Sequence, residues 1–216
     1  MENFRKETEA GLKTGISTNP VLQAFIHTVK KYNINYNYID AFLNSMEMDL
    51  TNSCYEPQQY NEYIYGSAEV VGLMCLQIFT GSDKMLFNDL VAPARSLGSA
   101  FQKVNFLRDI KSDMEERERI YLPGVNHAIK IDDLHKQDLE KEIEKEFEIA
   151  SEGIKKLPLG VKLGVYSAYL YYRGLFKKIK KLKVKELMSQ RVKVANTTKL
   201  ILLLRGLLEI KVFKLT

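Results

Sequence analysis

Four polar side chains recur at helical spacing within residues 100–123, AFQKVNFLRDIKSDMEERERIYLP. They are Gln102, Asn105, Asp109 and Asp113, separated by three, four and four positions. At 3.6 residues per turn, these side chains fall within a quarter of the circumference of a helix. Two carboxylates one turn apart repel each other and destabilise a free helix by about 0.2–0.5 kcal/mol. The pattern therefore favours a ligand that both carboxylates share.

Oxygen ligands of this kind suit magnesium, which proteins bind through one or two carboxylates together with water and substrate phosphate. We predict that Asp109 and Asp113 are metal ligands and that the Asn105 carbonyl extends the same row; manganese could replace magnesium. The bound ion would offset the charge of a diphosphate and stabilise it as a leaving group. Phe101 and Phe106 flank the row, so we expect a charged site beside an apolar space.

An isolated pair of aspartates also has a simpler interpretation. Both could be solvated surface carboxylates that pair with neighbouring cations. Those cations are Lys103, Arg108 and Arg117. Additional polar residues on the same face or just beyond it favour a functional site instead. These are Gln102, Asn105, Arg119 and Tyr121.

The composition is that of an ordinary globular protein, with 45% hydrophobic and 27% charged residues over 216 positions. A chain of this length can bury one core, and we expect residues 1–216 to form a single domain. Cys54 and Cys75 lack metal-ligand or CxxC spacing, and the N-terminus lacks the apolar stretch of a secretory signal. We find no apolar run of about eighteen residues that could span a membrane. These features predict a cytoplasmic protein.

Apolar residues recur with the helical period along almost the whole chain, which predicts an all-α fold. Pro93 is expected to kink or restart the helix that contains it. Residues 119–131 are expected to form a connector. The expected helices cover about 19–32, 38–51, 59–80, 88–118, 133–157, 159–183 and 185–214.

The net charge of +5 conceals an asymmetry. Residues 173–216 contain 13 Lys and Arg against 2 Glu, a balance of +11, whereas the remainder holds 19 basic and 25 acidic residues. Such a segment is typical of a surface that meets nucleic acid or an anionic membrane, and also of a solvated lysine-rich helix. Because no nucleic-acid-binding motif accompanies it, we expect no nucleic-acid partner.

Two segments resemble the signatures of the squalene and phytoene synthases. Residues 97–123, LGSAFQKVNFLRDIKSDMEERERIYLP, are similar to the second aspartate-rich signature of that family, roughly LGxAxQxxNxLRDxxxDxxxxRxYxP. Residues 63–74, YIYGSAEVVGLM, resemble the other signature, YxYxVAGxVG. The order and separation of the two segments also match, and the similarity covers about residues 20–195. The resemblance implies the class I isoprenoid synthase fold, an all-α bundle around a central cavity.

The resemblance also implies a role for each matching position. Asp109 and Asp113 match the residues that hold magnesium and diphosphate, and Arg119 and Tyr121 match residues near the diphosphate. Positions that match the substrate cleft are Tyr63, Ser67, Ala68, Val71, Gly72, Leu97, Gly98, Phe101, Gln102 and Asn105. Tyr171 and Arg191 match a tyrosine and an arginine on the late helices. For the apolar members, ordinary core packing is the alternative interpretation.

Two features depart from the family pattern. The resemblance implies a second DxxxD cluster on an N-terminal helix, and the acidic residues before position 60 do not supply one. Because family chains are longer at the N-terminus, we predict that this domain is incomplete there, which leaves its catalytic competence open. Glu69 stands where the family pattern has glycine, and it must face solvent or a partner because burying it unpaired is costly.

The implied activity is the head-to-head condensation of two farnesyl or geranylgeranyl diphosphates to squalene, phytoene or a related product, with magnesium assisting the departure of diphosphate. No glycine-rich dinucleotide motif supports NADPH as a cofactor. The alternative is a non-catalytic relative that keeps the fold as a binding or assembly protein. Since the implied substrates and products are lipids, the basic C-terminal segment could make peripheral contact with a membrane. The sequence does not indicate an oligomeric state.

Overall fold

The computed structural model describes residues 1–122, 125 and 131–211, and this part of the chain is an all-α bundle. Tyr65–Glu69 is a π-helix, η1, between α4 and α5. Among the described residues the one β-type contact is an isolated bridge between Cys54 and Ile120. The helices are α1 (Glu2–Thr14), α2 (Pro20–Tyr32), α3 (Tyr36–Thr51), α4 (Pro57–Ile64), α5 (Val70–Thr80), α6 (Lys84–Glu115), α7 (Asp133–Lys156), α8 (Leu159–Lys180), α9 (Val184–Leu187) and α10 (Asn196–Lys211).

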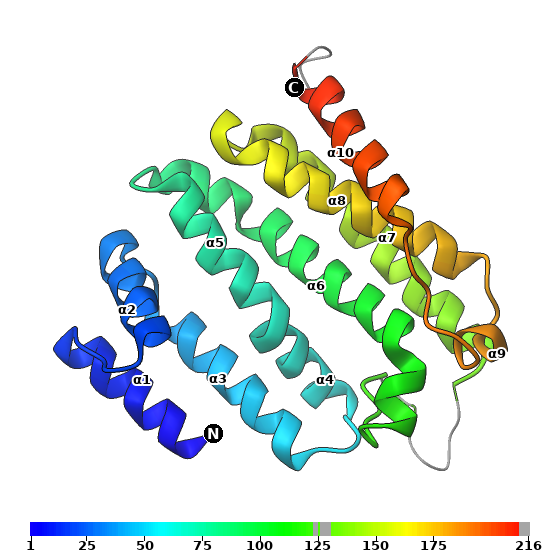
Figure 1. Ribbon diagram of the computed structural model, residues 1–216, viewed down its shortest axis with the longest axis horizontal. Coiled ribbons are helices and arrows are strands. Elements are labelled where there is room, and N and C mark those ends of the chain that lie inside the picture. Colours follow the sequence, from blue (N-terminus) through cyan, green and yellow to red (C-terminus); the bar gives the residue numbers. More distant parts are fainter. Residues whose placement is uncertain (123–124, 126–130, 212–216) are drawn as a thin grey trace.

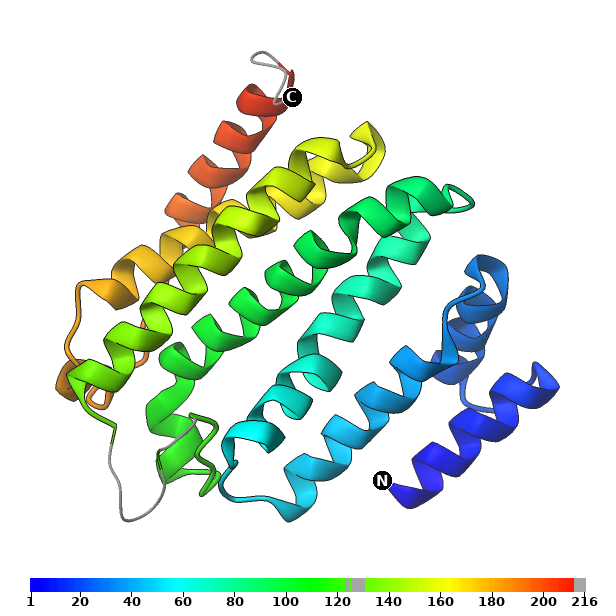
Figure 2. The ribbon, with the colours of Figure 1, turned by 180° about the vertical axis from the view of Figure 1, so that it is seen from behind.

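The helices lie side by side, roughly in chain order, from α1 and α2 at one edge to α10 at the other (Figure 1). The long helix α6 is central. It packs against η1 and α5 on one side and against α7 and α8 on the other, as the view from behind also shows (Figure 2). A site on α6 can therefore be lined by helices from both halves of the chain.

Side-chain caps set the starts of several helices. The Asn19 carboxamide accepts a hydrogen bond from the Val21 amide at 3.0 Å, and Pro20 occupies the first helical position, as the sequence predicts. Asp83 caps α6 by accepting from the Leu86 amide at 2.9 Å. Asp132 caps α7 in the same way. These caps satisfy amide groups that a helix leaves without internal partners.

The helices differ from the expected ones in three places. Helix α1 was not predicted because residues 2–14 are mostly polar, and Arg5 holds it to α3 through Asp40 and Glu47 at 2.7 and 2.8 Å. Pro93 lies inside the continuous helix α6, so the helix does not restart there. Its ring packs where Gly153 of α7 has no side chain, since a Cβ there would lie 2.2 Å from the Pro93 Cβ.

The third difference is in the expected helix at 185–214, which is divided into α9 and α10. Val192 and Val194 are buried between them, whereas Arg191 and Lys193 are exposed. This alternation has the period of extended backbone, and it buries two β-branched side chains that a helix would place on different faces.

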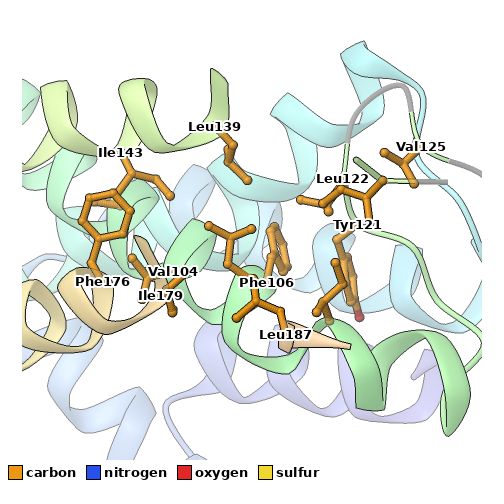
Figure 3. Close-up of a cluster of buried hydrophobic side chains, with 14 of the residues drawn as sticks. Val104, Phe106, Tyr121, Leu122, Val125, Leu139, Ile143, Phe176, Ile179 and Leu187 are labelled. Atoms are coloured by element: carbon orange, nitrogen blue, oxygen red, sulfur yellow. The ribbon is translucent and has the colours of Figure 1, made fainter. Parts of the chain in front are cut away.

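The largest hydrophobic cluster joins α4, α6, α7, α8 and α9 to the connector after α6. Phe106 stacks on Tyr121 with ring centroids 4.6 Å apart, and Phe176 and Ile179 of α8 approach Ile143 of α7 (Figure 3). This cluster anchors the carboxylate-bearing end of α6. Figure 3 labels Val104, Phe106, Tyr121, Leu122, Val125, Leu139, Ile143, Phe176, Ile179 and Leu187.

The continuous helical stretch Pro57–Thr80 is long and apolar enough, by length and composition alone, to cross a membrane. The sequence expectation of no such stretch was therefore too strict. In the described structure, however, this segment packs between α3 and α6, and Val70, Leu73 and Leu76 are buried. These contacts are those of a core helix.

Helix α6 approaches η1 more closely than side chains normally allow. A Cβ built on Gly98 would lie 2.5 Å from the Ala68 carbonyl oxygen and 3.2 Å from the Glu69 Cα. Because both neighbours are backbone atoms, neither can rotate away. Glycine at this position therefore sets the distance between the two helices.

Gly98→Ala should lower the free energy of unfolding by about 1–3 kcal/mol, because the new methyl group pushes α6 away from η1. The matched control is Gly164→Ala on α8, where an added Cβ meets nothing within 4 Å. The control should be neutral or stabilise the protein by up to about 1 kcal/mol through helix propensity. Urea denaturation of both variants measures the difference, and equal stability would contradict the close-approach argument.

Candidate active site

An apolar cavity of about 630 Å³ lies between η1–α5, α6, α7 and α8. Small residues line two of its walls: Ala68 and Gly72 on one side, and Gly160, Gly164 and Ala168 of α8 on the other. Their short side chains leave the space that larger residues would fill. Eight of the predicted cleft residues line the cavity: Ser67, Ala68, Val71, Gly72, Leu97, Gly98, Phe101 and Gln102.

The two predicted metal ligands lie on α6 beyond the cavity, and neither is a solvated surface carboxylate. The side chain of Asp109 is 14% exposed and that of Asp113 is 7% exposed. Asp109 accepts hydrogen bonds from Arg108 and from the Arg191 Nε at 2.6 Å. Arg117 donates to Asp113 at 2.8 Å. The structure thus brings Arg191, from the segment before α10, to the α6 carboxylates.

The partners of these aspartates are only partly those of the simpler interpretation. Arg108 and Arg117 pair with them, whereas Lys103 does not. Lys103 is buried and forms ion pairs with Glu142 and Glu146 of α7. This pairing fixes α6 to α7 between the cavity and the carboxylate end.

The two carboxylates have different acidities because their surroundings differ. Burial tends to raise the pKa of Asp109, but the guanidinium groups of Arg108 and Arg191 outweigh it and hold the pKa below its usual value. Burial raises the pKa of Asp113, and the charge of Asp109 adds to this effect against the opposing cation of Arg117. As the pH falls, Asp113 therefore binds a proton before Asp109 does.

Aromatic residues connect the cavity to the polar end of α6. The rings of Phe101 and Tyr172 stack with centroids 3.9 Å apart, and the Tyr172 hydroxyl donates to the Asn105 carbonyl at 3.3 Å. The predicted residue Tyr171 instead lies beneath the Lys199 ammonium, 5.9 Å from its ring centroid. The sequence analysis named Tyr171 and not Tyr172, because no local pattern indicates which of the two tyrosines faces Asn105.

A second polar cluster centres on Asp49, at the end of α3, and includes three predicted residues. Its carboxylate accepts hydrogen bonds from the hydroxyls of Tyr55, Tyr63 and Tyr121 at 3.2, 3.1 and 3.0 Å. Arg119 lies 3.8 Å from the same carboxylate and donates to the Tyr121 hydroxyl at 3.4 Å. This cluster fixes the connector after α6 against α3 and α4.

Burial raises the pKa of each of these three tyrosines, and the negative charge of Asp49 raises it further. The hydroxyls therefore stay protonated and remain donors at neutral pH. Asp49 and Tyr55 were not predicted to be site residues. Asp49 is separated from Tyr121 by 72 positions, so no local pattern indicates their contact.

Glu69, the departure from the family pattern, has the partner that the sequence argument required. The Arg95 Nε donates to its carboxylate at 2.6 Å, and the Arg95 guanidinium lies 5.4 Å from the centroid of the Tyr65 ring. The charge is therefore paired at the edge of the cavity rather than buried alone.

A model of the squalene/phytoene synthase family matches residues 1–198. The chain belongs to the squalene/phytoene synthase family.

Curated relatives and solved structures of this family agree. The chain is 25% identical to a phytoene synthase of Arthrospira platensis, over 84% of this chain and 66% of that protein. It is 28% identical to a 15-cis-phytoene synthase of Synechocystis, over 81% of this chain and 58% of that protein. The chain thus spans less than two thirds of the length of these relatives.

A crystal structure of a dehydrosqualene synthase in complex with ligand superposes with a TM-score of 0.80 at 23% identity, covering 97% of this chain and 77% of that one. A squalene synthase of Alicyclobacillus acidocaldarius superposes with a TM-score of 0.70 at 18% identity, covering 83% of this chain and 72% of that one. The predicted all-α isoprenoid synthase fold is confirmed.

The residues of this family member fit magnesium by donor chemistry. No group of three His, Cys, Asp or Glu side chains in the described part of the chain is arranged to hold a metal ion. Asp109, Asp113 and Asn105 nevertheless supply hard oxygen donors along α6. Magnesium commonly binds to one or two carboxylates when substrate phosphates supply further ligands. A metal held jointly with a diphosphate is therefore compatible with this set.

Asp49→Asn should lower the free energy of unfolding by about 2 kcal/mol, because an amide cannot accept all three buried tyrosine hydroxyls. The matched control is Asp89→Asn, which changes an exposed carboxylate paired with Lys156. The control should change stability by less than about 0.5 kcal/mol. Urea denaturation of both variants checks this, and similar small effects would show that the Asp49 cluster does not hold the connector.

The Asp113 carboxyl should titrate at a higher pH than that of Asp109, given the directions of their pKa shifts. Arg117→Ala should raise the pKa of Asp113 further, because it removes a cation that stabilises the carboxylate. Carbon-detected NMR of the aspartate carboxyls across a pH titration measures both pKa values. Lys84→Ala, an exposed change at the other end of α6, serves as the control. If Asp109 were protonated at a higher pH than Asp113, the arginine pairs of Asp109 would not stabilise its carboxylate as described.

Proposed function

We propose that this chain binds prenyl diphosphates and takes part in their head-to-head condensation to squalene, phytoene or a related product. The substrates would be two farnesyl or geranylgeranyl diphosphates. Membership of the squalene/phytoene synthase family supports this class of reaction. The residues of α6 connect this class of reaction to the present chain.

One observation carries the proposal: a single helix holds both an apolar cavity wall and a polar end. Lining residues of α6 run from Leu90 to Gln102. Asp109 follows Gln102 by seven residues, or about 10 Å along the helix. This order matches an amphiphile whose apolar chain occupies the cavity and whose diphosphate lies near Asp109 and Asp113.

The polar end contains four arginines that lie beside its aspartates, and such groups suit a polyanionic head group. Arg108 and Arg191 contact Asp109, Arg117 contacts Asp113, and Arg119 lies near Asp49. Arginine binds phosphate oxygens in a bidentate manner and stays charged at all relevant pH values. We propose that some of these guanidinium groups turn from carboxylate to diphosphate when substrate binds.

The residues would act on the first chemical step by favouring loss of diphosphate. The bond between the first prenyl carbon and its oxygen breaks, and the electron pair leaves with the diphosphate, whose charge the arginines stabilise. The allylic cation is then attacked by the double bond of the second substrate, which loses a proton to close a cyclopropane ring. An apolar cavity excludes water that would otherwise capture the cation.

Magnesium, held by Asp109, Asp113 and the Asn105 carbonyl, would supply further neutralisation of the leaving diphosphate. The hydroxyl groups of tyrosines near the site, such as Tyr172 and Tyr121, would offer oxygen dipoles. NADPH is not part of the proposal. With the groups named here, the reaction would stop at the cyclopropyl diphosphate or, after loss of the second diphosphate and a proton, at a dehydro product such as phytoene. Squalene would require hydride from a separate reductant.

The second candidate is a non-catalytic relative that binds prenyl diphosphates or assembles with other proteins. The observation that favours it is the pairing of both α6 carboxylates with arginines in the absence of a facing carboxylate cluster among the described residues. Direct binding and turnover measurements separate the two candidates.

Magnesium-dependent binding of a non-hydrolysable farnesyl diphosphate analogue should be detectable by calorimetric titration. Asp109→Ala/Asp113→Ala should weaken that binding by about 100-fold, because the variant cannot hold the metal and only the arginines remain to bind the diphosphate. The matched control, Asp89→Ala/Asp138→Ala, removes two exposed carboxylates that each pair with a lysine. Its affinity should equal that of the wild type.

Product analysis by mass spectrometry, with farnesyl and geranylgeranyl diphosphates in turn, then tests condensation. Binding with a thirty- or forty-carbon product supports the enzyme. Binding without product supports the non-catalytic relative. If the double variant and its control bound the analogue with equal affinity, Asp109 and Asp113 would not hold the metal in either candidate function.

A further inference from the structure

Helix α10 exposes a broad apolar face that no described element covers. Its members are between 43% and 62% exposed. We call this set the α10 outer face: Leu200, Ile201, Leu203, Leu204 and Leu208. On a helical wheel these positions form one continuous arc. Apolar arcs of this width on a peripheral helix mark interaction surfaces.

The opposite face of α10 packs against α8. The leucines of the outer face are therefore exposed although the helix itself is held in place. Gly206 is buried, and a Cβ built there would lie 3.5 Å from Leu170 of α8. The Tyr166 hydroxyl donates to Glu209 at 2.5 Å, and Leu202 and Ile210 pack into the cluster beneath. α10 lies at the edge of the molecule beside α8 (Figure 1).

Lysines gather beside the N-terminal end of α10. They lie on the last turn of α8, on or next to α9, and in the segment that leads to α10, and all are exposed. These are Lys177, Lys181, Lys183, Lys185 and Lys193. Among the described residues, Arg191 and Arg205 are the cations after Lys180 that pair with carboxylates, and none of the five lysines forms such a pair. Figures 1 and 2 show the end of α8 and α9 at one end of the bundle, with an extended segment that leads from α9 to the start of α10 alongside α8.

We propose that the α10 outer face and this lysine group dock together onto an anionic lipid bilayer. The helix would lie in the plane of the interface, with its leucines among the acyl chains and the lysines against the head groups. Each lysine near an anionic surface adds about 1 kcal/mol of attraction, or roughly fivefold in affinity.

Charge complementarity favours a bilayer over a second copy of this chain. A symmetric dimer through α10 would use the same patch on both subunits. It would therefore bring two segments, each with a balance of +11 over residues 173–216, next to each other. Like charges placed across an interface oppose association. An anionic bilayer carries negative charge and therefore attracts this positively charged segment.

The test is flotation of the purified chain with vesicles of phosphatidylcholine alone or with 30% phosphatidylglycerol (roughly the anionic content that produces a strong surface potential). The wild type should bind the anionic vesicles and bind at least about tenfold more weakly to neutral ones or at high salt. No prenyl substrate is needed, so the result is independent of the proposed function.

Two variants remove the two halves of the surface. Leu200→Ser/Leu204→Ser/Leu208→Ser should weaken binding to anionic vesicles at least about tenfold by removing apolar insertion. Its matched control changes three exposed apolar residues elsewhere, Val21→Ser/Met85→Ser/Leu134→Ser, and should bind like the wild type.

Lys177→Gln/Lys181→Gln/Lys185→Gln should likewise weaken binding at least about tenfold and reduce its salt dependence. Its matched control is the exposed set Lys13→Gln/Lys30→Gln/Lys84→Gln. Circular dichroism and thermal melting verify that each variant is folded. Because the changed side chains are exposed, melting temperatures should stay close to that of the wild type.

Two outcomes would overturn the proposal. Binding that the α10 and lysine variants weaken no more than their controls would place the contact elsewhere. A wild type that ignores anionic vesicles but forms a dimer in sedimentation, which the leucine variant dissociates, would assign the α10 outer face to self-association.

Discussion

The close approach of α6 to η1 at Gly98 is the constraint on which the rest of the structure depends. Backbone meets backbone there, so the separation of the two helices is set without adjustable side chains. The small residues Ala68 and Gly72 then leave an empty volume next to the contact instead of filling it. Buried Lys103, paired with Glu142 and Glu146, holds the opposite side of α6 to α7. The cavity persists because its walls are fixed from both sides.

Burial of charge at the far end of α6 follows from the same rigidity. A helix that cannot tilt keeps Asp109 and Asp113 in a poorly solvated position, where an unpaired carboxylate would be costly. The arginines compensate by pairing with these carboxylates, and arginine is also the side chain best suited to bind a diphosphate. Substrate binding would thus exchange one set of partners for another rather than create charge pairs from nothing. Such an exchange keeps the desolvation cost of binding low.

The sequence predicted what depends on local pattern. Helical periodicity located most helices, and the spacing of Asp109 and Asp113 placed both on one face of α6. It could not predict contacts between distant segments. Asp49 meets Tyr121 across 72 positions, and Arg191 reaches Asp109 across 82. Helix α1 escaped prediction because its sequence is mostly polar, and its Arg5 pairs with α3 and its Gly11 packs against Ile26 of α2, across distances that no local pattern indicates.

The two apolar surfaces of this molecule are built on different principles, and the difference indicates different uses. The cavity is concave and lined by small residues, and the helix α6 that forms one of its walls ends in paired aspartates and arginines, which suits one long chain with one anionic end. The α10 outer face is convex, made of leucine and isoleucine, and bordered by lysines, which suits an extended surface with many anionic groups. Before it binds to the cavity, a lipid substrate of the proposed reaction would reside in a bilayer with such a surface. Helix α8 contributes Gly164 and Ala168 to the cavity and supports α10 through Tyr166 and Leu170, so the same helix joins the two surfaces.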